Sequence, residues 1–491
     1  MRSTGPLRFP EVDPRPAPHK DPDNSGRRLV RPAAGDLAVR AYWLLGGLFL
    51  VTTCVAVAAS RGLVADGAFY FIAVLQHPWP TTFEHGRLAA HALTQWPLVL
   101  AVQLGLTDLT ALRLIHSFGL FYLGPLHLLL CWWFVPTSET NELFWPLLAL
   151  FAGSINASFV AMTEAHVLTW LFWPLVMFLI HGEFRHRLQT AGFTLLLVAS
   201  ASAYETMALQ GLVLAGLAVG RWRRTTTSER WIWAAVAGWF MLGAGVGAYF
   251  AVNPRSAENR GGFVAGLLRF VGTGRDDLNY PVLLSFGVLV LVMLVLLLGP
   301  FRRIVFQTLM GSLTVMGMLV AMWPIFKPDS LRPVQQFQAR AWITLLPVGL
   351  ALLMLLMRHR VPKPAAFRMA LGFLVALGLT QMTWQTVATA QWYGYTRVFR
   401  EQLDRHTGFI PYESSELARE RIGIQALRNL TWNYTNPLMS IALAPSGQVA
   451  SIVGVPKGMW QLFDPTDPEA LPKLGRYGVD YSRYLQSLGA R

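Results

Sequence analysis

The sequence predicts an all-α polytopic membrane protein with about eleven transmembrane helices and a small α+β extracytoplasmic domain at its C-terminal end. Of its 491 residues, 53% are hydrophobic and 14% are charged, whereas soluble globular chains carry about 25% charged residues. Apolar runs recur from residue 39 to residue 391, and many reach the roughly 18 residues that cross a ~30 Å hydrocarbon layer. These two observations indicate a chain that crosses a bilayer many times.

The predicted spans follow these apolar runs in order. The segments 190–203 and 205–220 are short, so they form either two tilted helices or one broken unit. No internal sequence repeat relates one part of the chain to another. The predicted spans cover residues 39–60, 109–135, 143–161, 164–181, 190–203, 205–220, 231–252, 280–300, 304–325, 341–357 and 369–390.

Basic residues in the short loops predict the orientation. Arginine or lysine occurs in the N-terminal tail and in the loops at 185–187, 221–230, 302–303 and 358–368. With about eleven spans these loops all lie on one side, which the positive-inside rule makes cytoplasmic. Of the loops on that side, only 136–142 lacks a basic residue. This distribution explains the net charge of +14, and we expect no nucleic acid as a partner.

The two ends of the chain differ from its middle. Residues 1–38 are rich in Pro, Arg and Asp and predict a disordered cytoplasmic tail. The first apolar run starts too late and is too long for a signal peptide, so 39–390 is expected to form the transmembrane domain of a cytoplasmic (inner) membrane protein. Residues 391–491 predict a periplasmic, extracytoplasmic domain. Within it we expect a helix over 414–432 and a hairpin over 440–455.

The first outer loop, residues 61–108, contains two apolar segments that are shorter than a span. The segments “ADGAFYFIAVLQ” (65–76) and “HALTQWPLVLAVQLG” (91–105) have the length of helices that lie in the membrane interface. We expect them to frame a cavity at the outer leaflet, with Asp66 at its mouth.

Three acidic residues are predicted at this outer face. Asp66 follows the first span, Glu164 opens the fourth span beside His166, and Glu205 lies in the break between two short apolar segments. Ionisable groups at membrane depth are costly and tend to be functional. Two carboxylates held there could serve as a general base and as a partner that orients substrate or binds a metal. Alternatively, each acid only stabilises a helix N-terminus through the macrodipole.

A later outer loop combines cations with amides. The stretch “FKPDSLRPVQQFQARAW” carries Arg332 and Arg340, with Gln335 and two further glutamines between them. Guanidinium groups hold phosphate in a bidentate manner, and neighbouring amides suit the hydroxyls of a sugar. The alternative is ordinary anchoring to anionic lipid headgroups.

The same acids and imidazoles raise the question of a metal. Asp66, His85, Glu164 and His166 are ligand types that a divalent cation accepts, but no close ligand spacing supports such a site. We expect no obligatory cofactor and keep a divalent cation as an alternative. The two cysteines lie in predicted spans without a CxxC pattern, which predicts neither a zinc site nor a disulfide.

The order of these features resembles that of the GT-C-type membrane glycosyltransferases, especially relatives of the protein O-mannosyltransferases and the lipid A aminoarabinose transferases. In that superfamily an acidic pair and an aromatic residue follow the first span, where this chain has Asp66 and Tyr70. A proline-bearing segment then leads through an “LG” turn into an Arg-Leu pair, as in “QWPLVLAVQLGLTDLTALRL”. A second acid opens the fourth span, where Glu164 stands. Gly67 departs from the pattern, because many members carry their second acid there.

This resemblance covers about residues 39–225 and implies a sugar carried on polyprenyl phosphate. The sugar would pass, with inversion, to a glycan, lipid or protein acceptor at the outer face of the membrane. The resemblance implies a general base at Asp66 and an orienting or cation-binding acid at Glu164. Around this catalytic pair we expect substrate contacts from Tyr70, His85, His166, Glu205, Arg332, Gln335 and Arg340.

Two other functions fit the same features. A transporter or flippase for a lipid-linked or anionic envelope precursor would also place charged groups at membrane depth. Transporters often show repeated halves, which this sequence lacks. A scaffold for envelope assembly would use mainly the C-terminal domain.

Overall fold

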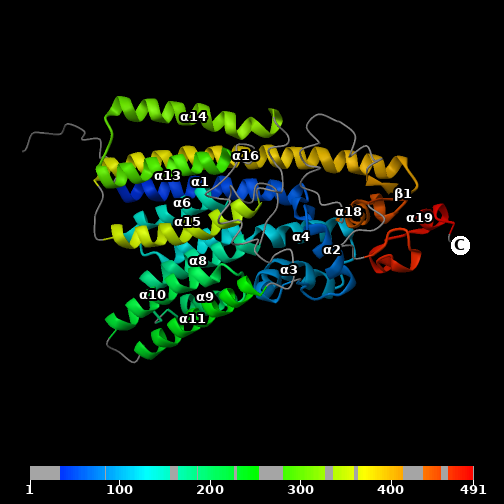
Figure 1. Cartoon of the computed structure of the whole chain (residues 1–491), viewed down its shortest axis with the longest axis horizontal. Coiled ribbons are helices and arrows are strands. Elements are labelled where there is room, and N and C mark those ends of the chain that lie inside the picture. The colour runs from blue at the N-terminus through cyan, green and yellow to red at the C-terminus, as the bar shows by residue number, and fades with distance from the viewer. Residues whose placement is uncertain are drawn as a thin grey trace, which may run out of the picture.

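The structure is a computed structural model, and its helices run mostly along one common axis (Figure 1). A compact end closes one end of the helix bundle. It is formed by the C-terminal elements together with α2 (Gly67–Gln76), α3 (Leu88–Gln103) and α4 (Leu109–Phe121). The residues that the structure describes are 34–82, 84–154, 164–184, 186–225, 229–253, 280–326, 336–358, 363–412, 435–454 and 463–489.

Several helices have the properties of membrane spans. Within the described part of the chain, five helices are long and apolar enough to cross a membrane. A sixth span results if α4 (Leu109–Phe121) and α5 (Leu123–Phe134), which are bent by 43°, count as one. Exposed apolar side chains remain on four of these helices, as a lipid-facing surface requires, whereas the helix Glu164–His181 is buried almost throughout by other parts of the protein. The five are α1 (Ala34–Ala58), α8 (Glu164–His181), α11 (Arg230–Val252), α14 (Arg303–Phe326) and α16 (Pro364–Arg405).

The other predicted spans also correspond to helices. The short predicted segments 190–203 and 205–220 form two separate helices, α9 (Arg187–Ser200) and α10 (Met207–Arg224). Helix α10 packs along α11. The predicted span 143–161 begins as α6 (Phe144–Ala149) and a π-helical turn (Leu150–Ser154), and residues 155–163 lie outside the described part. The count of about eleven crossings stays a prediction. These further helices are α9 (Arg187–Ser200), α10 (Met207–Arg224), α13 (Tyr280–Leu298) and α15 (Gln336–Met357).

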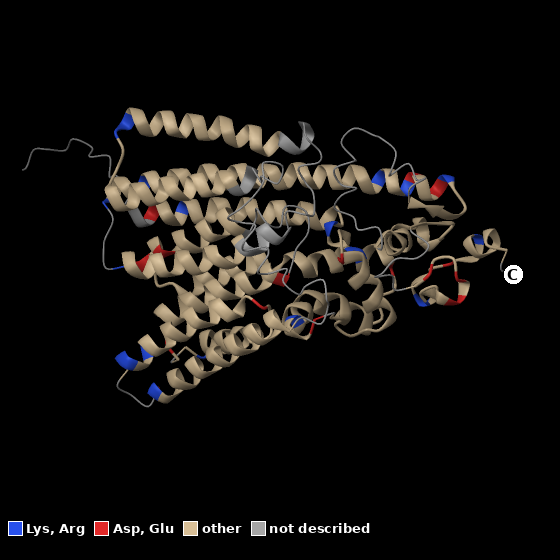
Figure 2. Ribbon diagram, in the orientation of Figure 1, with Lys and Arg blue, Asp and Glu red and all other residues tan. Residues whose placement is uncertain are grey.

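One end of the bundle gathers the basic loops, shown at the left of Figure 2. Glu142 comes from the loop that lacks basic residues. Its Oε2 lies 2.7 Å from His181 Nε2, and its Oε1 lies 3.2 Å from Arg358 Nε. Nearby, the Arg221 guanidinium donates to the carbonyl of Gly182. Loops distant in sequence therefore meet at one end, as the charge pattern predicts. That this end is cytoplasmic stays a prediction.

The C-terminal segment differs from the prediction in two ways. Helix α16 continues to Arg405 without a break at the expected domain boundary after residue 390. The hairpin predicted over 440–455 is wrong, because the chain there forms α18 (Asn436–Leu443) and then strand β2 (Ser451–Gly454). β2 pairs in parallel with β1 (Gly408–Pro411). Every residue of α18 is buried, so a strand pattern of alternating exposure does not apply. The helix predicted over 414–432 lies outside the described residues.

The C-terminal elements share a hydrophobic core with the first outer loop. Buried side chains of α18, β2 and α19 (Ser482–Ser487) pack in one cluster with α2 (Gly67–Gln76), α3 (Leu88–Gln103) and the outer half of α16. The Tyr477 hydroxyl donates to the Leu75 carbonyl at 3.0 Å. All residues of α2 from Gly67 to Leu75 are buried. Helix α2 is therefore covered by other parts of the protein, and its position at the membrane interface stays a prediction.

Candidate functional site

A strained turn leads from α1 to Asp66. The backbone has positive φ at Ser60 (54°) and at Ala65 (52°), a conformation that residues with a Cβ rarely adopt. Helix α4 holds the turn, because the Gly62 amide donates to Ser117 Oγ at 3.2 Å. Strain of this kind persists only where surrounding structure enforces it, and it is concentrated at functional sites. The turn thus sets the position of Asp66 at the start of α2.

Gly67 shows why a second acid does not follow Asp66. A Cβ atom at Gly67 would lie 1.7 Å from the Gly62 carbonyl oxygen, well inside any van der Waals contact. A side chain there would force the turn open. The absence of a paired carboxylate at this point therefore has a steric cause.

A capping role does not account for Asp66. The residue is half-buried and precedes α2, yet its carboxylate accepts no hydrogen bond from the amides of the first helical turn. By contrast, Asp108 caps α4 by accepting from the Ala111 amide at 2.6 Å. One turn beyond Asp66, the Tyr70 amide donates to the Asp66 carbonyl at 3.0 Å. Asp66, directly before α2, and Tyr70, within α2, therefore lie about one helical turn apart.

Arg87 joins two of the predicted acids. Its Nε lies 2.8 Å from Glu205 Oε1, and its Nη1 lies 3.6 Å from Glu164 Oε1. The guanidinium also lies over the ring of Tyr204, 5.0 Å from the centroid. All three charged side chains are at least 85% buried, with 11–15% exposed. One cation thus contacts two carboxylates, one from α8 and one from the turn before α10.

His91 connects this ion-pair cluster to α2. His91 Nε2 lies 3.4 Å from Glu164 Oε1 and 3.4 Å from the Tyr70 hydroxyl. Its other ring nitrogen, Nδ1, lies 3.2 Å from Gln95 Nε2. Gln95 in turn exchanges two hydrogen bonds with the backbone of Thr81, at 2.7 and 2.8 Å. The imidazole is therefore held at both nitrogens, which fixes its ring plane.

The electrostatics of the cluster keep Arg87 charged. Burial alone would lower the pKa of Arg87, but Glu164, Tyr204 and Glu205 together raise that pKa well above its ordinary value. Glu205 uses one carboxylate oxygen for Arg87, while Oε2 is buried with no hydrogen-bond partner among the described residues. Such an oxygen can accept a hydrogen bond from a substrate hydroxyl. The cluster can therefore orient hydroxyl groups and stabilise developing charge.

Other predicted site residues lie elsewhere. His85 is exposed, two residues before Arg87. His166 is buried, and its ring faces Trp170 at 5.8 Å inside the bundle. Arg332 and Gln335 lie outside the described residues. The backbone of Arg340 belongs to α15, and its side chain also lies outside the described part.

The structure thus brings together Tyr70, Glu164 and Glu205 and adds three residues that sequence reasoning did not assign to the site. Arg87, His91 and Gln95 complete the network. The spacing of His91 and Gln95, four residues apart in an apolar helix, is a signal that two polar side chains share one helical face. No comparable signal distinguishes Arg87 from its neighbours in the loop.

Among the described ranges, no three His, Cys, Asp or Glu side chains are grouped as metal ligands. Glu164 and Glu205 each contact Arg87 instead. A divalent cation remains a prediction of the sequence.

Comparisons of the chain with protein-family models, with curated proteins and with solved structures found no match.

Proposed function

We propose that this chain is a membrane glycosyltransferase that moves a sugar from a polyprenyl-phosphate donor to an acceptor at the outer face of the cytoplasmic membrane. The observation that supports the proposal most is the buried network of Tyr70, Arg87, His91, Glu164 and Glu205. It lies one helical turn along α2 from Asp66. Its place, at the N-terminal end of α8, is opposite the basic loops at the C-terminal end of that helix.

In the proposed reaction Asp66 is the general base. Its carboxylate takes the proton from an acceptor hydroxyl, and that oxygen forms a bond to the anomeric carbon of the sugar. The bond between the anomeric carbon and the phosphate oxygen breaks on the opposite face, which inverts the configuration. Polyprenyl phosphate leaves, and a nearby cation stabilises the charge that develops on it.

The network gives the second acid a defined role in this proposal. Glu164, fixed by Arg87 and His91, orients the acceptor or the sugar. Glu205 Oε2 accepts a hydrogen bond from a sugar hydroxyl, and Tyr70 is connected to Glu164 through His91. Arg332, Gln335 and Arg340 stay the proposed contacts to the donor phosphate, and His85 and His166 stay proposed contacts to the substrate.

The experiment measures release of polyprenyl phosphate from labelled polyprenyl-phosphate sugars in membranes that hold the wild type or a variant. Asp66→Asn should reduce turnover at least 100-fold, the usual range for loss of a general base, and Glu164→Gln should reduce it as well. The matched controls are Asp404→Asn and Glu401→Gln on the outer part of α16, away from the network. These should transfer sugar at the wild-type rate.

Two outcomes would overturn the proposal. Unchanged turnover in Asp66→Asn would remove this residue from the chemistry. The second outcome has two parts. A folded wild type would show no turnover with any cellular donor and a native acceptor extract, and it would move a lipid-linked or anionic precursor across proteoliposome membranes. That result would favour the transporter instead.

A further inference from the structure

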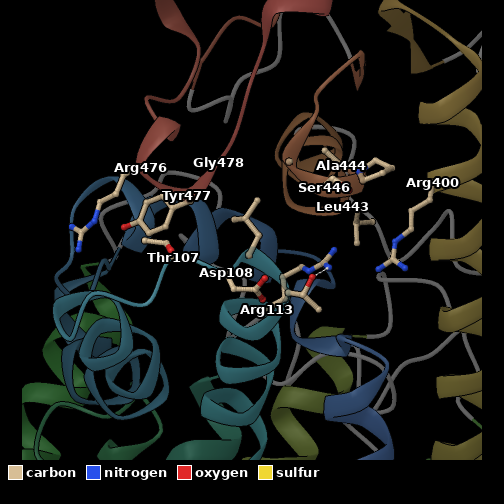
Figure 3. A pocket seen from close by; sticks show the side chains of 14 residues that line it. Thr107, Asp108, Arg113, Arg400, Leu443, Ala444, Ser446, Arg476, Tyr477 and Gly478 are labelled. Atoms are coloured by element: carbon tan, nitrogen blue, oxygen red, sulfur yellow. Dashed lines mark hydrogen bonds between the residues drawn. The ribbon is translucent and has the colours of Figure 1, made fainter.

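A cavity lies between the start of α4, the outer part of α16 and the C-terminal segment (Figure 3). Its volume is about 520 Å³, within the range of about 300–1,000 Å³ that is usual for small-molecule sites. Three arginines line it, each from a different part of the chain: Arg113 of α4, Arg400 of α16 and Arg476 before Tyr477. None of these side chains belongs to the network around Arg87.

The lining of this cavity is strongly cationic. Asp108 is the only acid that lines it among the described residues, and its Oδ1 already accepts from the Ala111 amide at 2.6 Å. Figure 3 shows Arg113 and Arg400 extending toward each other across the cavity, and the two guanidinium groups repel each other. Like charges held this close are unfavourable unless an anion lies between them.

The donors of the two facing arginines are incompletely used. Arg113 donates to the Ala442 carbonyl at 3.0 Å and to Thr110 Oγ1 at 2.9 Å, which fixes its side chain. The Nε atoms of Arg113 and of Arg400 are both buried with no hydrogen-bond partner among the described residues. On the far side, Arg476 donates to the Val102 carbonyl at 3.3 Å. Arg113 and Arg400 therefore each keep a buried donor that a bound anion could use.

We propose that this cavity binds the phosphate group of a water-soluble or polymer-borne molecule. Two guanidinium groups offer the planar, paired donors that phosphate oxygens accept, and the volume leaves room for a sugar-sized substituent. The proposal is independent of the proposed transfer reaction.

The length of α16 decides between a soluble phosphate and a lipid headgroup. The helix begins at Pro364, near the basic end of the bundle. About 20 helical residues cross the hydrocarbon layer, so Arg400, which follows Pro364 by 36 residues, lies roughly 24 Å beyond it, at about 1.5 Å per residue. A phosphate that belongs to a lipid of the bilayer would not reach this distance from the hydrocarbon layer, whereas a phosphate in solution would.

The test uses the purified full chain in neutral-lipid nanodiscs and measures binding of inorganic phosphate and of glucose 1-phosphate by calorimetry. We expect both to bind the wild type, with glucose as the uncharged control showing no binding. Arg400→Gln should weaken binding at least tenfold, and Arg400→Lys should weaken it less because the charge remains. The matched control is Arg397→Gln, three residues away on the same helix, where the arginine is exposed and paired with Glu401 at 3.7 Å.

Binding that is equal in the wild type and Arg400→Gln would overturn the proposal, and so would a phosphate affinity no higher than that for chloride. Nε of Arg400 has no hydrogen-bond partner among the described residues, and a melting temperature close to that of the wild type would verify the fold of the variant. Phosphate binding that is lost when anionic phospholipid is added to the nanodiscs would show that a headgroup occupies the site and would refute the soluble source.

Discussion

At Arg87, a single guanidinium group contacts carboxylates that reach it from two separate elements. The distances of 2.8 Å to Glu205 and 3.6 Å to Glu164 are those of a direct hydrogen-bonded pair and a looser ion pair. Because water is largely excluded, the loss of one charge would leave the others without compensation. The residue is therefore as important for folding as for any chemistry that the two acids perform.

We predict that Arg87→Gln destabilises the fold by about 3–5 kcal/mol, the usual cost of removing one partner of a buried ion pair. The double variant Arg87→Gln with Glu205→Gln should recover part of this loss, because one uncompensated carboxylate is removed with the cation. Thermal unfolding of the purified variants in detergent would measure both effects. Exposed Arg397→Gln is the control and should change stability by less than about 0.5 kcal/mol. An Arg87→Gln variant as stable as the wild type would contradict the role of this ion-pair cluster.

At the scale of elements, α16 connects the bundle to its compact end. Its 42 residues extend about 63 Å at 1.5 Å per residue, which is twice the thickness of the ~30 Å hydrocarbon layer. The inner half packs against α1, α13 and α14, and the outer half packs against α18 and β2. Arg61, in the turn after α1, donates to Thr389 Oγ1 at 2.8 Å and to Gln385 Oε1 at 3.1 Å. This side chain ties the turn before Asp66 to the middle of α16.

Helix α19 provides a prediction that depends on pH. The buried Tyr484 hydroxyl donates to the Pro465 carbonyl at 2.6 Å, and burial, with the nearby Asp464 carboxylate, raises the pKa of Tyr484 above its ordinary 10.0. An unfolded chain loses this proton near pH 10 while the folded chain keeps it, so the contribution is complete below pH 10 and is lost as pH rises further.

Tyr484→Phe should therefore be less stable than the wild type by about 0.5–1.5 kcal/mol at pH 8, and the difference should shrink above pH 10. Unfolding midpoints from pH 8 to pH 11 would measure this change. Tyr393→Phe, at an exposed position of α16, is the control and should follow the wild type. A difference that stays constant over the whole pH range would refute this linkage.

At the scale of the whole molecule, two polar regions lie at opposite ends of an apolar bundle. The basic loops surround Glu142 at one end, while the Arg87 cluster, the arginine-lined cavity and the C-terminal segment lie toward the other. The buried core of the second end includes α2 and the outer half of α16 together with C-terminal side chains. The membrane part and the C-terminal segment are therefore one packed structure at this end.

Removal of residues 406–491 should accordingly damage the membrane part and not merely release a separate domain. Truncation would expose the apolar side chains of α2 and α16 that the C-terminal segment covers, at a cost of about 25 cal/mol per Å² of apolar surface. We expect a truncated chain that aggregates or melts at a lower temperature, as size-exclusion chromatography and thermal unfolding would detect. Tyr477→Phe, which loses only the bond to Leu75, should cost about 1 kcal/mol and retain the fold. A truncated chain that is monodisperse, with the full-length melting temperature, would contradict the shared core.

Some helix ends were predictable from the sequence and others were not, since α16 extends from Pro364 to Arg405 where a span over 369–390 was predicted. Span 164–181 coincides with α8, and 231–252 differs from α11 by one residue. Helix limits follow from local properties, namely a run of apolar residues and the charges or breaks that stop it. The parallel pairing of β1 with β2 was not predictable in this way, because the two strands lie some 40 residues apart.

The sequence by itself determined that this is a helical membrane chain and which residue types stand at one face, because hydrophobicity and charge act on each segment separately. Only the tertiary structure decided which of them meet. His85 and Arg87 occupy the same short turn, yet the first is exposed while the second contacts a carboxylate 118 residues away. That outcome depends on how α3, α8 and α10 pack against one another, and no local pattern contains this information. The same packing brings Arg113 and Arg400 into one cavity, since a charged cavity is a property of the assembled fold rather than of any segment.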